Sequence, residues 1–545
     1  MAEIIMAVSI MAAIILGVIS LDRVQTVVYE VDPLNPDKEI IARCAGVIKR
    51  GGLVAFPTET VYGLGASALN HEAVSKVFEA KARPKGNPLI IHVSNLRQVD
   101  SVVTHVSPLA EALMKTFWPG PLTLLFPKSD SVLDVVTAGL TNVAVRMPDH
   151  PVSQALIEAC GVPLVAPSAN LSGRPSPTRA RDVLADLDGK VDIILDGGPT
   201  HIGVESTVLD VSRESPVILR PGAIGREEIE AALESSGFPG PVLVDGNGPG
   251  SSFGPDAEAQ APGANYKHYV PEARLYLAAG TPVEQRQKII FHALKLAFSG
   301  TKVAVLASEE NFSFYRPLED MARGLLHVFI LGSRDSLSLV ATRLYSAIRR
   351  AEEAGARVIL SETFGLEGIG LAIANRLEYA SRGKKLPGDL SVTPLNLLMI
   401  CTGNTCRSPM AEGIFKESWK EAGEPYPIQV SSAGVSTVPG MPASQEAVEA
   451  VRRMGVDISR HLSAPVSKES LEAADLIIAM TRAHKQMLLA RYPESGHKVV
   501  TLSEVWPETG GDVIDPYGKS QEEYDKTAEL LEKSLRGLAK LLSGQ

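Results

Sequence analysis

A short segment in the C-terminal third of the chain constrains the fold more than any other. Residues 395–400 form an apolar run that ends at Cys401, and the chain then passes through a loop that contains Gly403 and Asn404. Residues 410–421 have the pattern of a helix. An unbroken apolar run predicts a buried strand, and a strand that leads through so short a loop into a helix is typical of a parallel α/β sheet.

The composition of this loop favours an anion site. Gly403 and Asn404 tolerate the backbone dihedral angles that turn successive N–H groups inward. Ser408 is the expected cap of the helix and Pro409 its first residue, and the helix N-terminus adds positive potential. Cys401 would then stand where a thiolate nucleophile is stabilised.

Two further residues complete a reaction scheme for the loop. Arg407 offers a planar fork of N–H donors to two phosphoryl oxygens. Asp515, ahead of the amphipathic helical pattern of residues 522–542, can protonate a leaving group and later activate water, although an Asp-Pro pair by itself is more often only a turn. The expected catalytic residues are Cys401, Arg407 and Asp515, and the expected phosphate-loop residues are Thr402, Gly403, Asn404, Thr405, Cys406 and Ser408.

These motifs, with Ser-Ser-Ala-Gly at 431–434 and Asp-Leu-Ile-Ile-Ala-Met at 475–480, resemble the low-molecular-weight protein phosphatases across residues 395–545. The resemblance implies an α/β domain with a parallel sheet that acts on phosphoproteins. Tyrosine-directed members usually carry a bulky aliphatic residue at the place of Thr405 and two aromatic residues at the place of Tyr517 and Gly518. In this respect the chain is similar to the bacterial protein-arginine phosphatases, which makes phosphoarginine the expected substrate. Phosphotyrosine stays the alternative, since a threonine also fits as an isosteric loop residue.

Residues 24–236 alternate β-rich runs with helical stretches, which predicts one large α/β domain. Lys81, Arg83 and Lys85 bring three cations into a loop bounded by proline and glycine, a composition suited to a triphosphate. The expected helices are 72–82 and 151–160, and the expected strands are 53–56, 89–93, 122–126, 143–146, 164–166, 193–195 and 207–211.

The segments 57–65, 81–92, 167–173, 205–208 and 219–222 together resemble the YrdC family, the threonylcarbamoyl-AMP synthases. The resemblance implies that L-threonine, bicarbonate and ATP, which carries Mg²⁺, form threonylcarbamoyl-adenylate and pyrophosphate, and that other enzymes then modify tRNA. It implies ATP contacts by Lys81, Arg83, Asn87, Asn142, Ser168, Asn170, Ser176, Arg220 and Tyr266. It implies contacts to threonine or its carbamate by Thr58, Thr60, His92, Arg146, Ala166 and Ser206.

The rest of the chain divides by composition. Residues 237–274 are expected to be a linker because Gly and Pro are concentrated in its first part, and residues 383–394 are a second, polar linker. Residues 275–382 resume the α/β alternation, with helices at 284–299, 336–355 and 370–381 and strands at 302–307 and 356–361. The resemblance to the synthases extends to residue 382, which implies a two-domain synthase with a smaller Rossmann-like domain.

Charge and cysteine content limit the remaining possibilities. The chain has 53 Lys and Arg against 63 Asp and Glu, a net charge of −10, and acidic residues also outnumber basic ones over 24–236. This balance argues against stable nucleic-acid binding, although an RNA-binding module is kept as the alternative for the first domain. Four cysteines are too few for a disulfide scaffold and fit a reducing cytoplasm.

Three features stay open at this stage. Residues 1–23 form an apolar extension, and the uncharged run at 4–19 makes association with a membrane the alternative to a cytoplasmic location. No cluster of His, Cys, Asp or Glu suggests a protein-held metal, and no organic cofactor is expected. The oligomeric state does not follow from the sequence.

Overall fold

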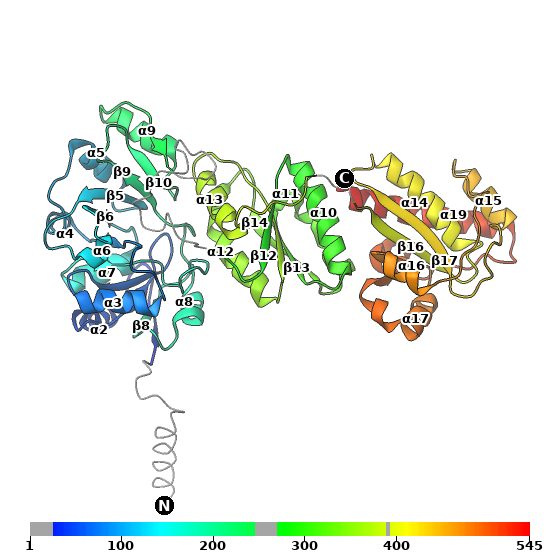
Figure 1. Cartoon of the computed structure of the whole chain (residues 1–545), viewed down its shortest axis with the longest axis horizontal. Helices are drawn as coiled ribbons and strands as arrows, with labels where there is room; N and C mark the ends of the chain where they lie inside the picture. The colour runs from blue at the N-terminus through cyan, green and yellow to red at the C-terminus, as the bar shows by residue number, and fades with distance from the viewer. Residues whose placement is uncertain (1–24, 246–269, 389–392) are drawn as a thin grey trace, which may run out of the picture. The chain divides into compact units, whose positions relative to one another are not determined.

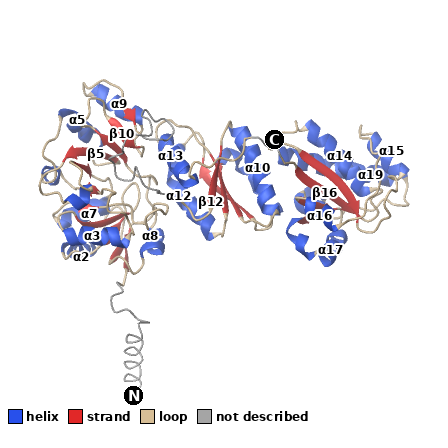
Figure 2. Cartoon of the chain, in the orientation of Figure 1, coloured by secondary structure: helices blue, strands red, loops and turns tan. Residues whose placement is uncertain are grey.

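The computed structural model of the chain describes residues 25–245, 270–388 and 393–545, and it has the expected mixed α/β architecture (Figures 1 and 2). These residues form two compact units. The first unit runs up to Val270 and includes Asp335–Ser346 and Phe364–Ala380. The second contains Pro271–Arg334, Ala347–Thr363 and Ser381–Gln545. The extension at 1–23 and Tyr266 lie outside the described residues.

The first unit is built on an eleven-stranded mixed sheet with the order β1-β8-β2-β3-β7-β4-β6-β5-β9-β10-β11. Its middle strands are short and buried, so they are apolar runs without alternation. The strands are β1 (Val27–Glu30), β2 (Val54–Phe56), β3 (Gly63–Ser67), β4 (Ile90–His92), β5 (Leu122–Pro127), β6 (Asn142–Arg146), β7 (Leu164–Val165), β8 (Ile193–Asp196), β9 (Thr207–Asp210), β10 (Val217–Arg220) and β11 (Leu243–Val244).

Helices cover this sheet, and most begin with a side-chain cap. Asp37 accepts hydrogen bonds from the first-turn N–H groups of α2, and Asn70 does so for α3. The helices are α2 (Lys38–Lys49), α3 (His71–Ala80), α4 (Leu96–Asp100), α5 (Pro108–Phe117), α6 (Asp134–Thr137), α7 (Pro151–Cys160), α8 (Ala180–Leu187) and α9 (Arg226–Ser235).

The second unit holds two four-stranded sheets whose neighbouring strands are all parallel. The first has the order β12-β15-β13-β14 and consists of β12 (Arg274–Ala278), β13 (Val303–Ser308), β14 (Leu326–Gly332) and β15 (Val358–Glu362). The helices between and after these strands are α10 (Pro282–Phe298), α11 (Glu309–Met321), α12 (Leu337–Glu353) and α13 (Gly370–Ser381). The residues of α12 up to Ser346 and those of α13 up to Ala380 belong to the first unit, and the remaining residues of both helices belong to the second.

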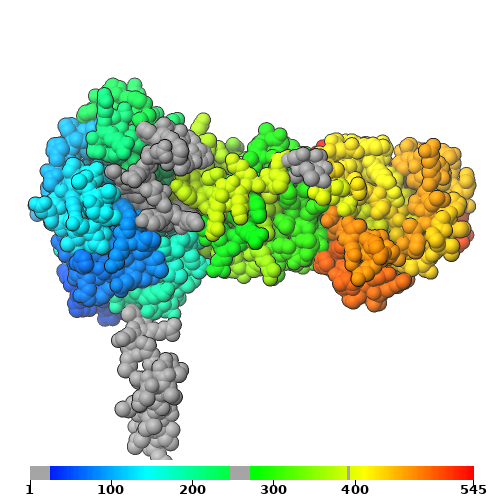
Figure 3. Space-filling model, in the orientation of Figure 1, coloured from blue at the N-terminus to red at the C-terminus, as the bar shows by residue number. Residues whose placement is uncertain are grey.

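The last sheet has the order β17-β16-β18-β19. Alternate side chains of β16 serve two different cores: Leu397 and Met399 pack with α14 and α19, whereas Leu398 and Ile400 pack with α16 and α17. Figure 1 shows these helix pairs on opposite faces of the strands, and Figure 3 shows that side chains fill the body from yellow to red. The elements are β16 (Leu395–Cys401), α14 (Arg407–Glu421), β17 (Ile428–Gly434), α15 (Gln445–Arg452), α16 (Lys468–Ala473), β18 (Leu476–Ala479), α17 (Arg482–Arg491), β19 (Val499–Thr501), α18 (Leu502–Val505) and α19 (Gln521–Ser543), with short 3-10 helices at Pro493–Lys498 and Pro507–Thr509.

The structure corrects two sequence-based expectations. The helix after the phosphate loop begins at Arg407 with Cys406 as its first flanking residue, so Ser408 lies inside the first turn and does not cap it. The Ser408 hydroxyl instead lies 3.0 Å from the Cys401 sulfur. The predicted linker 237–274 contains β11, which pairs with β10, because two apolar residues suffice to continue a sheet inside a Gly/Pro-rich segment.

The lengths and hydropathies of the helices show whether any of them could span a membrane. Among the described residues, none of the helices is both long enough and apolar enough to cross a bilayer. The apolar run at 4–19 lies outside these residues.

Candidate functional site

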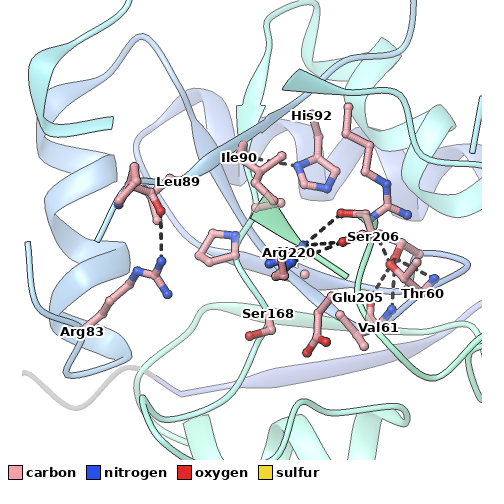
Figure 4. A pocket seen from close by; sticks show the side chains of 16 residues that line it. Thr60, Val61, Arg83, Leu89, Ile90, His92, Ser168, Glu205, Ser206 and Arg220 are labelled. Carbon is pink, nitrogen blue, oxygen red and sulfur yellow. Dashed lines mark hydrogen bonds between the residues drawn. The ribbon is translucent and has the colours of Figure 1, made fainter. Parts of the chain in front are cut away.

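A pocket in the first unit collects residues from the ends of several strands (Figure 4). It has a volume of about 590 Å³, counted out to its open mouth. The segment between β2 and β3, the loop after α3, and the ends of β4, β6 and β10 all contribute to its wall. Nine residues predicted from the sequence line it: Thr58, Thr60, Arg83, His92, Arg146, Ala166, Ser168, Ser206 and Arg220.

Arg146 is the most enclosed cation of the pocket wall. It ends β6 and is 4% exposed, and its Nη2 lies 2.6 Å from Glu59 Oε1. Its Nη1 donates to Thr60 Oγ1 at 2.9 Å, and Thr60 Oγ1 lies 2.8 Å from Thr58 Oγ1. The guanidinium is therefore fixed in one orientation at the pocket, which suits recognition of a planar carboxylate.

His92 lies beside this cation and is fully enclosed. Burial and the positive charges of Arg146 and Arg220 lower its pKa to about 3, whereas a hydrogen bond with the Ile90 carbonyl acts in the opposite direction. The ring is therefore neutral at physiological pH, and it contributes a hydrogen-bonding surface without adding a positive charge to those of the arginines.

Arg220 and Ser206 form a second polar wall. Arg220 Nη2 donates to the Ser206 carbonyl at 2.9 Å and to Ser206 Oγ at 3.0 Å, as Figure 4 shows. Ser206 Oγ in turn lies 2.8 Å from Thr123 Oγ1. The end of β10 and the start of β9 are thus joined at the pocket by one arginine.

Five of the predicted nucleotide contacts that the structure describes lie outside the lining. Lys81 is buried, and its ammonium donates to the carbonyls of Ser168 and Asn170, the latter at 2.6 Å. Burial lowers the pKa of Lys81 well below its ordinary value, and the neighbouring Arg83 lowers it further. Asn87 and Asn170 are also buried beneath the surface. In the described part of the chain, Lys81 therefore serves first to hold the loop that presents Ser168.

Two other predicted contacts take different places. Ser176 is buried and donates to Glu205 Oε1 at 2.5 Å, so it reaches the pocket only through that carboxylate. Asn142 opens β6, whereas the pocket residue Arg146 ends the same strand, so the two stand at opposite ends of it.

Glu205 is a pocket residue that the sequence reasoning did not assign. Burial by itself would raise its pKa, but the guanidiniums of Arg376 and Arg220 and a hydrogen bond from Ser176 lower it to about 2. The carboxylate is therefore ionised at physiological pH. Its position directly before Ser206 was the signal that could have identified it.

In the second unit, the expected phosphate loop lies between β16 and α14. Cys401 ends β16 and is buried, and its sulfur accepts a hydrogen bond from the Asn404 N–H at 3.3 Å. The Ser408 hydroxyl lies 3.0 Å from the same sulfur, so polar groups of the loop and of the first turn of α14 meet at Cys401.

Asn404 fixes the shape of the loop. Its φ is +53°, and its side chain donates to Ser408 Oγ and to Ser432 Oγ, both at 2.9 Å. Its side-chain oxygen accepts from the Ala464 N–H at 2.8 Å. A left-handed residue secured on three sides fixes the course of the loop, and its own N–H points at the Cys401 sulfur.

Arg407 and Asp515 meet at the loop although they are far apart in sequence. Arg407 Nη2 lies 2.7 Å from Asp515 Oδ2 and 3.3 Å from Thr402 Oγ1. Arg407 is buried, whereas half of the Asp515 side chain is exposed. The structure therefore brings Arg407 and Asp515, two of the predicted catalytic residues, together beside the loop that begins at Cys401.

His484 is a residue of this site that the sequence reasoning missed. Its two ring nitrogens lie 2.8 Å from Thr402 Oγ1 and 2.9 Å from Thr481 Oγ1. Burial and then the positive charge of Arg407 lower its pKa to about 4, whereas Asp515 and Asp512 act in the opposite direction. Since a single histidine carries no local motif, only the structure could connect it with Thr402.

Thr405 and Cys406 occupy the second half of the loop. Thr405 is half-buried, and its carbonyl accepts from the Ser444 N–H at 2.9 Å. The Cys406 sulfur is buried 3.4 Å from the Tyr524 hydroxyl and 3.5 Å from Ser444 Oγ. Cys401 and Cys406 are both free thiols.

The described residues contain no group of three or more His, Cys, Asp or Glu side chains that could hold a metal ion. The carboxylate nearest the first pocket, Glu205, is already paired with Arg376 at 2.9 Å. The donor set of the pocket therefore does not form a metal cage of its own.

The fold and the two sites define an α/β enzyme with two different centres, an arginine-lined pocket for small anionic substrates and a thiol-based phosphate loop. A family model described as telomere recombination matches residues 46–222, one described as threonylcarbamoyl-AMP synthase, C-terminal domain, matches 224–381, and one described as low molecular weight phosphotyrosine protein phosphatase matches 396–545. The chain belongs to the threonylcarbamoyl-AMP synthase family, and it carries at its C-terminus a member of the low-molecular-weight protein phosphatase family.

Individual relatives support both assignments. A threonylcarbamoyl-AMP synthase of Bacillus subtilis is 45% identical over 65% of this chain and 96% of its own length. A protein-arginine-phosphatase of the same organism is 42% identical over 27% of this chain and 97% of its own length. The crystal structure of P. abyssi Sua5 complexed with L-threonine is 42% identical and superimposes with a TM-score of 0.59, covering 66% of this chain and 99% of that one. The fusion predicted from the sequence is confirmed.

Proposed function

We propose that the synthase part of the chain joins L-threonine, bicarbonate and ATP into threonylcarbamoyl-adenylate and releases pyrophosphate. The observation that carries the proposal is the pocket itself, in which Arg146, Arg83 and Arg220 converge from three separate segments. The crystal structure of a relative with the same architecture contains bound L-threonine. Arg146 would hold the threonine carboxylate, and Arg83 and Arg220 would face the phosphates.

The reaction needs few proton transfers. The amino group of threonine and bicarbonate first form a carbamate with loss of water. A carbamate oxygen then attacks the α-phosphorus of ATP, a P–O bond forms, and the P–O bond to pyrophosphate breaks. The arginines of the pocket stabilise the negative charge that moves onto pyrophosphate. Mg²⁺ would enter bound to the phosphates of ATP, as part of the substrate.

Pyrophosphate release tests this proposal directly. It should require ATP, threonine and bicarbonate together, and threonylcarbamoyl-adenylate should appear in equal amount. Release that continues at the same rate without threonine would contradict the proposed reaction.

For the C-terminal domain, the proposed reaction is hydrolysis of phosphoarginine in proteins. Cys401 forms an S–P bond while the P–N bond to the guanidino group breaks, and Asp515 gives its proton to the leaving nitrogen. Asp515 then takes a proton from water, which attacks phosphorus and releases phosphate and the Cys401 thiolate. Arg407 and the loop N–H groups hold the phosphoryl oxygens in both steps.

The arginine preference rests on Thr405 and on the exposed Tyr517, which is followed by a glycine. A hydroxyl at the loop can accept a hydrogen bond from a guanidinium, which an aliphatic side chain cannot. Wild type should dephosphorylate a phosphoarginine protein faster than a phosphotyrosine peptide, and Thr405→Ile should shift this ratio toward phosphotyrosine. A wild-type preference for phosphotyrosine would establish the alternative substrate.

A further inference from the structure

Glu205 in the synthase pocket is held by residues that lie far outside the pocket in sequence. Arg376, in α13, donates from its Nε to Glu205 Oε2 at 2.9 Å. The Tyr345 hydroxyl, in α12, lies 3.1 Å from both Glu205 oxygens. Arg376 and Tyr345 are both fully buried, and both belong to the parts of α12 and α13 that are included in the first unit.

Arg376 also reaches a second pocket segment. Its Nη2 donates to the Pro221 carbonyl at 3.0 Å. Glu205 precedes Ser206 at the start of β9, whereas Pro221 follows Arg220 at the end of β10. A single guanidinium therefore connects the segment that carries Ser206 with the segment that carries Arg220.

These two segments are in close backbone contact. A Cβ at Gly222 would lie 2.2 Å from the Thr207 nitrogen, so the backbones are already in contact there. Helix α12 lies equally close to the segment that precedes Glu205. A Cβ at Gly203, whose φ is +83°, would lie 2.3 Å from the Thr342 Cα, and Thr342 Oγ1 donates to the His201 carbonyl at 2.8 Å.

Both oxygens of Glu205 are occupied by Ser176, Tyr345 and Arg376, so the carboxylate has no role as a base for substrate. If Arg376 lost its charge, the nearest remaining cation for this buried carboxylate would be Arg220, whose charge already acts on it. A buried carboxylate without its partner is costly, and the attraction would draw Arg220 away from the pocket.

We propose that Arg376 and Tyr345 are positioning residues of the synthase reaction, which fix Ser206 and Arg220 at the nucleotide side of the pocket by way of Glu205 and Pro221. The C-terminal domain of the synthase thus completes the geometry of the active site. This inference rests on the proposed function, which assigns Arg220 to the nucleotide.

The test compares Arg376→Gln, Arg376→Lys and Tyr345→Phe with Arg343→Gln, a change of an exposed arginine on α12. ATP affinity is measured by calorimetry, and kcat and KM by pyrophosphate release. Arg376→Gln should weaken ATP binding and raise the KM for ATP about tenfold or more, with a smaller change in kcat. Arg376→Lys should lie between it and wild type, and Tyr345→Phe should have a weaker effect.

The melting temperature of the synthase part in the same preparations shows whether each variant is folded, and phosphatase activity should not change. The double variant Glu205→Gln with Arg376→Gln should bind ATP better than Arg376→Gln alone, since it removes the unpaired charge. Unchanged ATP affinity in Arg376→Gln, or a loss equal to that of Arg343→Gln, would overturn the positioning role. If wild type binds ATP but forms no threonine-dependent pyrophosphate, the proposed reaction is wrong, and the ATP affinities of the variants still decide the positioning role. If wild type does not bind ATP, both proposals are overturned.

Discussion

At the scale of single residues, the two centres use arginine in different ways. Arg146 is held by Glu59 and Thr60, so the protein itself orients the guanidinium for a substrate. Arg407 is held by Thr402 and by Asp515, the residue that serves the leaving group in the proposed reaction. In the proposed reactions, the first arginine orients one substrate and the second couples anion binding with acid catalysis.

The first prediction follows from the geometry of Arg146. Arg146→Lys keeps the positive charge but loses the paired donors, so it should raise the KM for threonine by about 10-fold or more, given about 1.5–3 kcal/mol for each charge-assisted hydrogen bond. Steady-state kinetics with threonine varied at saturating ATP measures this. Lys128→Arg, an exchange of the same two residue types outside the pocket, is the matched control. An unchanged KM for threonine would show that Arg146 does not contact threonine.

A second prediction concerns His484 and pH. Its pKa is lowered to about 4 in the folded protein, so between pH 4 and about 6.5 the unfolded chain binds more protons than the folded one. Its contribution to stability is therefore complete above about pH 6.5 and is lost as the pH falls toward 4. In His484→Gln, which does not titrate, the phosphatase domain should lose less thermal stability between pH 7 and pH 5 than in wild type. His497→Gln, at an exposed position, should behave as wild type, and equal losses in all three proteins would contradict the prediction.

What the sequence could reveal of the sites depended on distance along the chain. The phosphate loop is a run of consecutive residues from Cys401 to Ser408, so its local pattern was sufficient. His484 contacts Thr402 from 82 residues away, and Arg376 contacts Glu205 from 171 residues away. Such partners are created by tertiary packing, and no local pattern marks them.

At the scale of elements, sequence-based prediction was accurate where large apolar side chains give a clear hydrophobic pattern. The predicted bounds of α7 and α13 agree with the structure, and β6 was recognised from its apolar run. Strand β3, with the sequence Gly-Leu-Gly-Ala-Ser, was missed because small residues give little hydrophobic signal even though all five are buried. Helix α11 was missed in part because Pro317 lies inside it.

The packing of α19 gives a prediction at this scale. Gly537 lies in the middle of this 23-residue helix, and a Cβ there would lie 2.3 Å from Cζ2 of the Trp506 indole. Gly537→Ala should therefore destabilise the phosphatase domain by about 1–3 kcal/mol through overpacking, although alanine is the better helix former by about 1 kcal/mol. Chemical denaturation measures the change. Lys533→Ala, on an exposed position of the same helix, should be close to neutral, and a stabilised Gly537→Ala would contradict the packing argument.

At the scale of the whole molecule, the two active centres belong to different compact units. The synthase pocket is formed by residues of the first unit, and the phosphate loop by residues of the second. No residue is shared by the two sites among those described. The chemistry of each centre is therefore complete without the other.

This separation predicts independent loss of the two activities. Cys401→Ser should abolish phosphatase turnover, because a hydroxyl is far less ionised than an activated thiol, and it should leave synthesis of threonylcarbamoyl-adenylate unchanged. Arg146→Lys should have the opposite profile. Assaying both reactions on both variants makes each the control for the other. A fall of synthase activity in Cys401→Ser would show that the units are coupled.

The outermost strand β1 of the large sheet can pair only after its distant partner has been synthesised. β1 pairs in parallel with β8, and Thr26 donates to the carbonyl of Val191, 165 residues further on. A ribosome adding about 5–20 residues per second needs roughly 8 to 33 s to produce that partner. During this interval Val27 and Val28 have no neighbouring strand, so the emerging N-terminal segment depends on its surroundings in the cell to keep it from pairing with another chain.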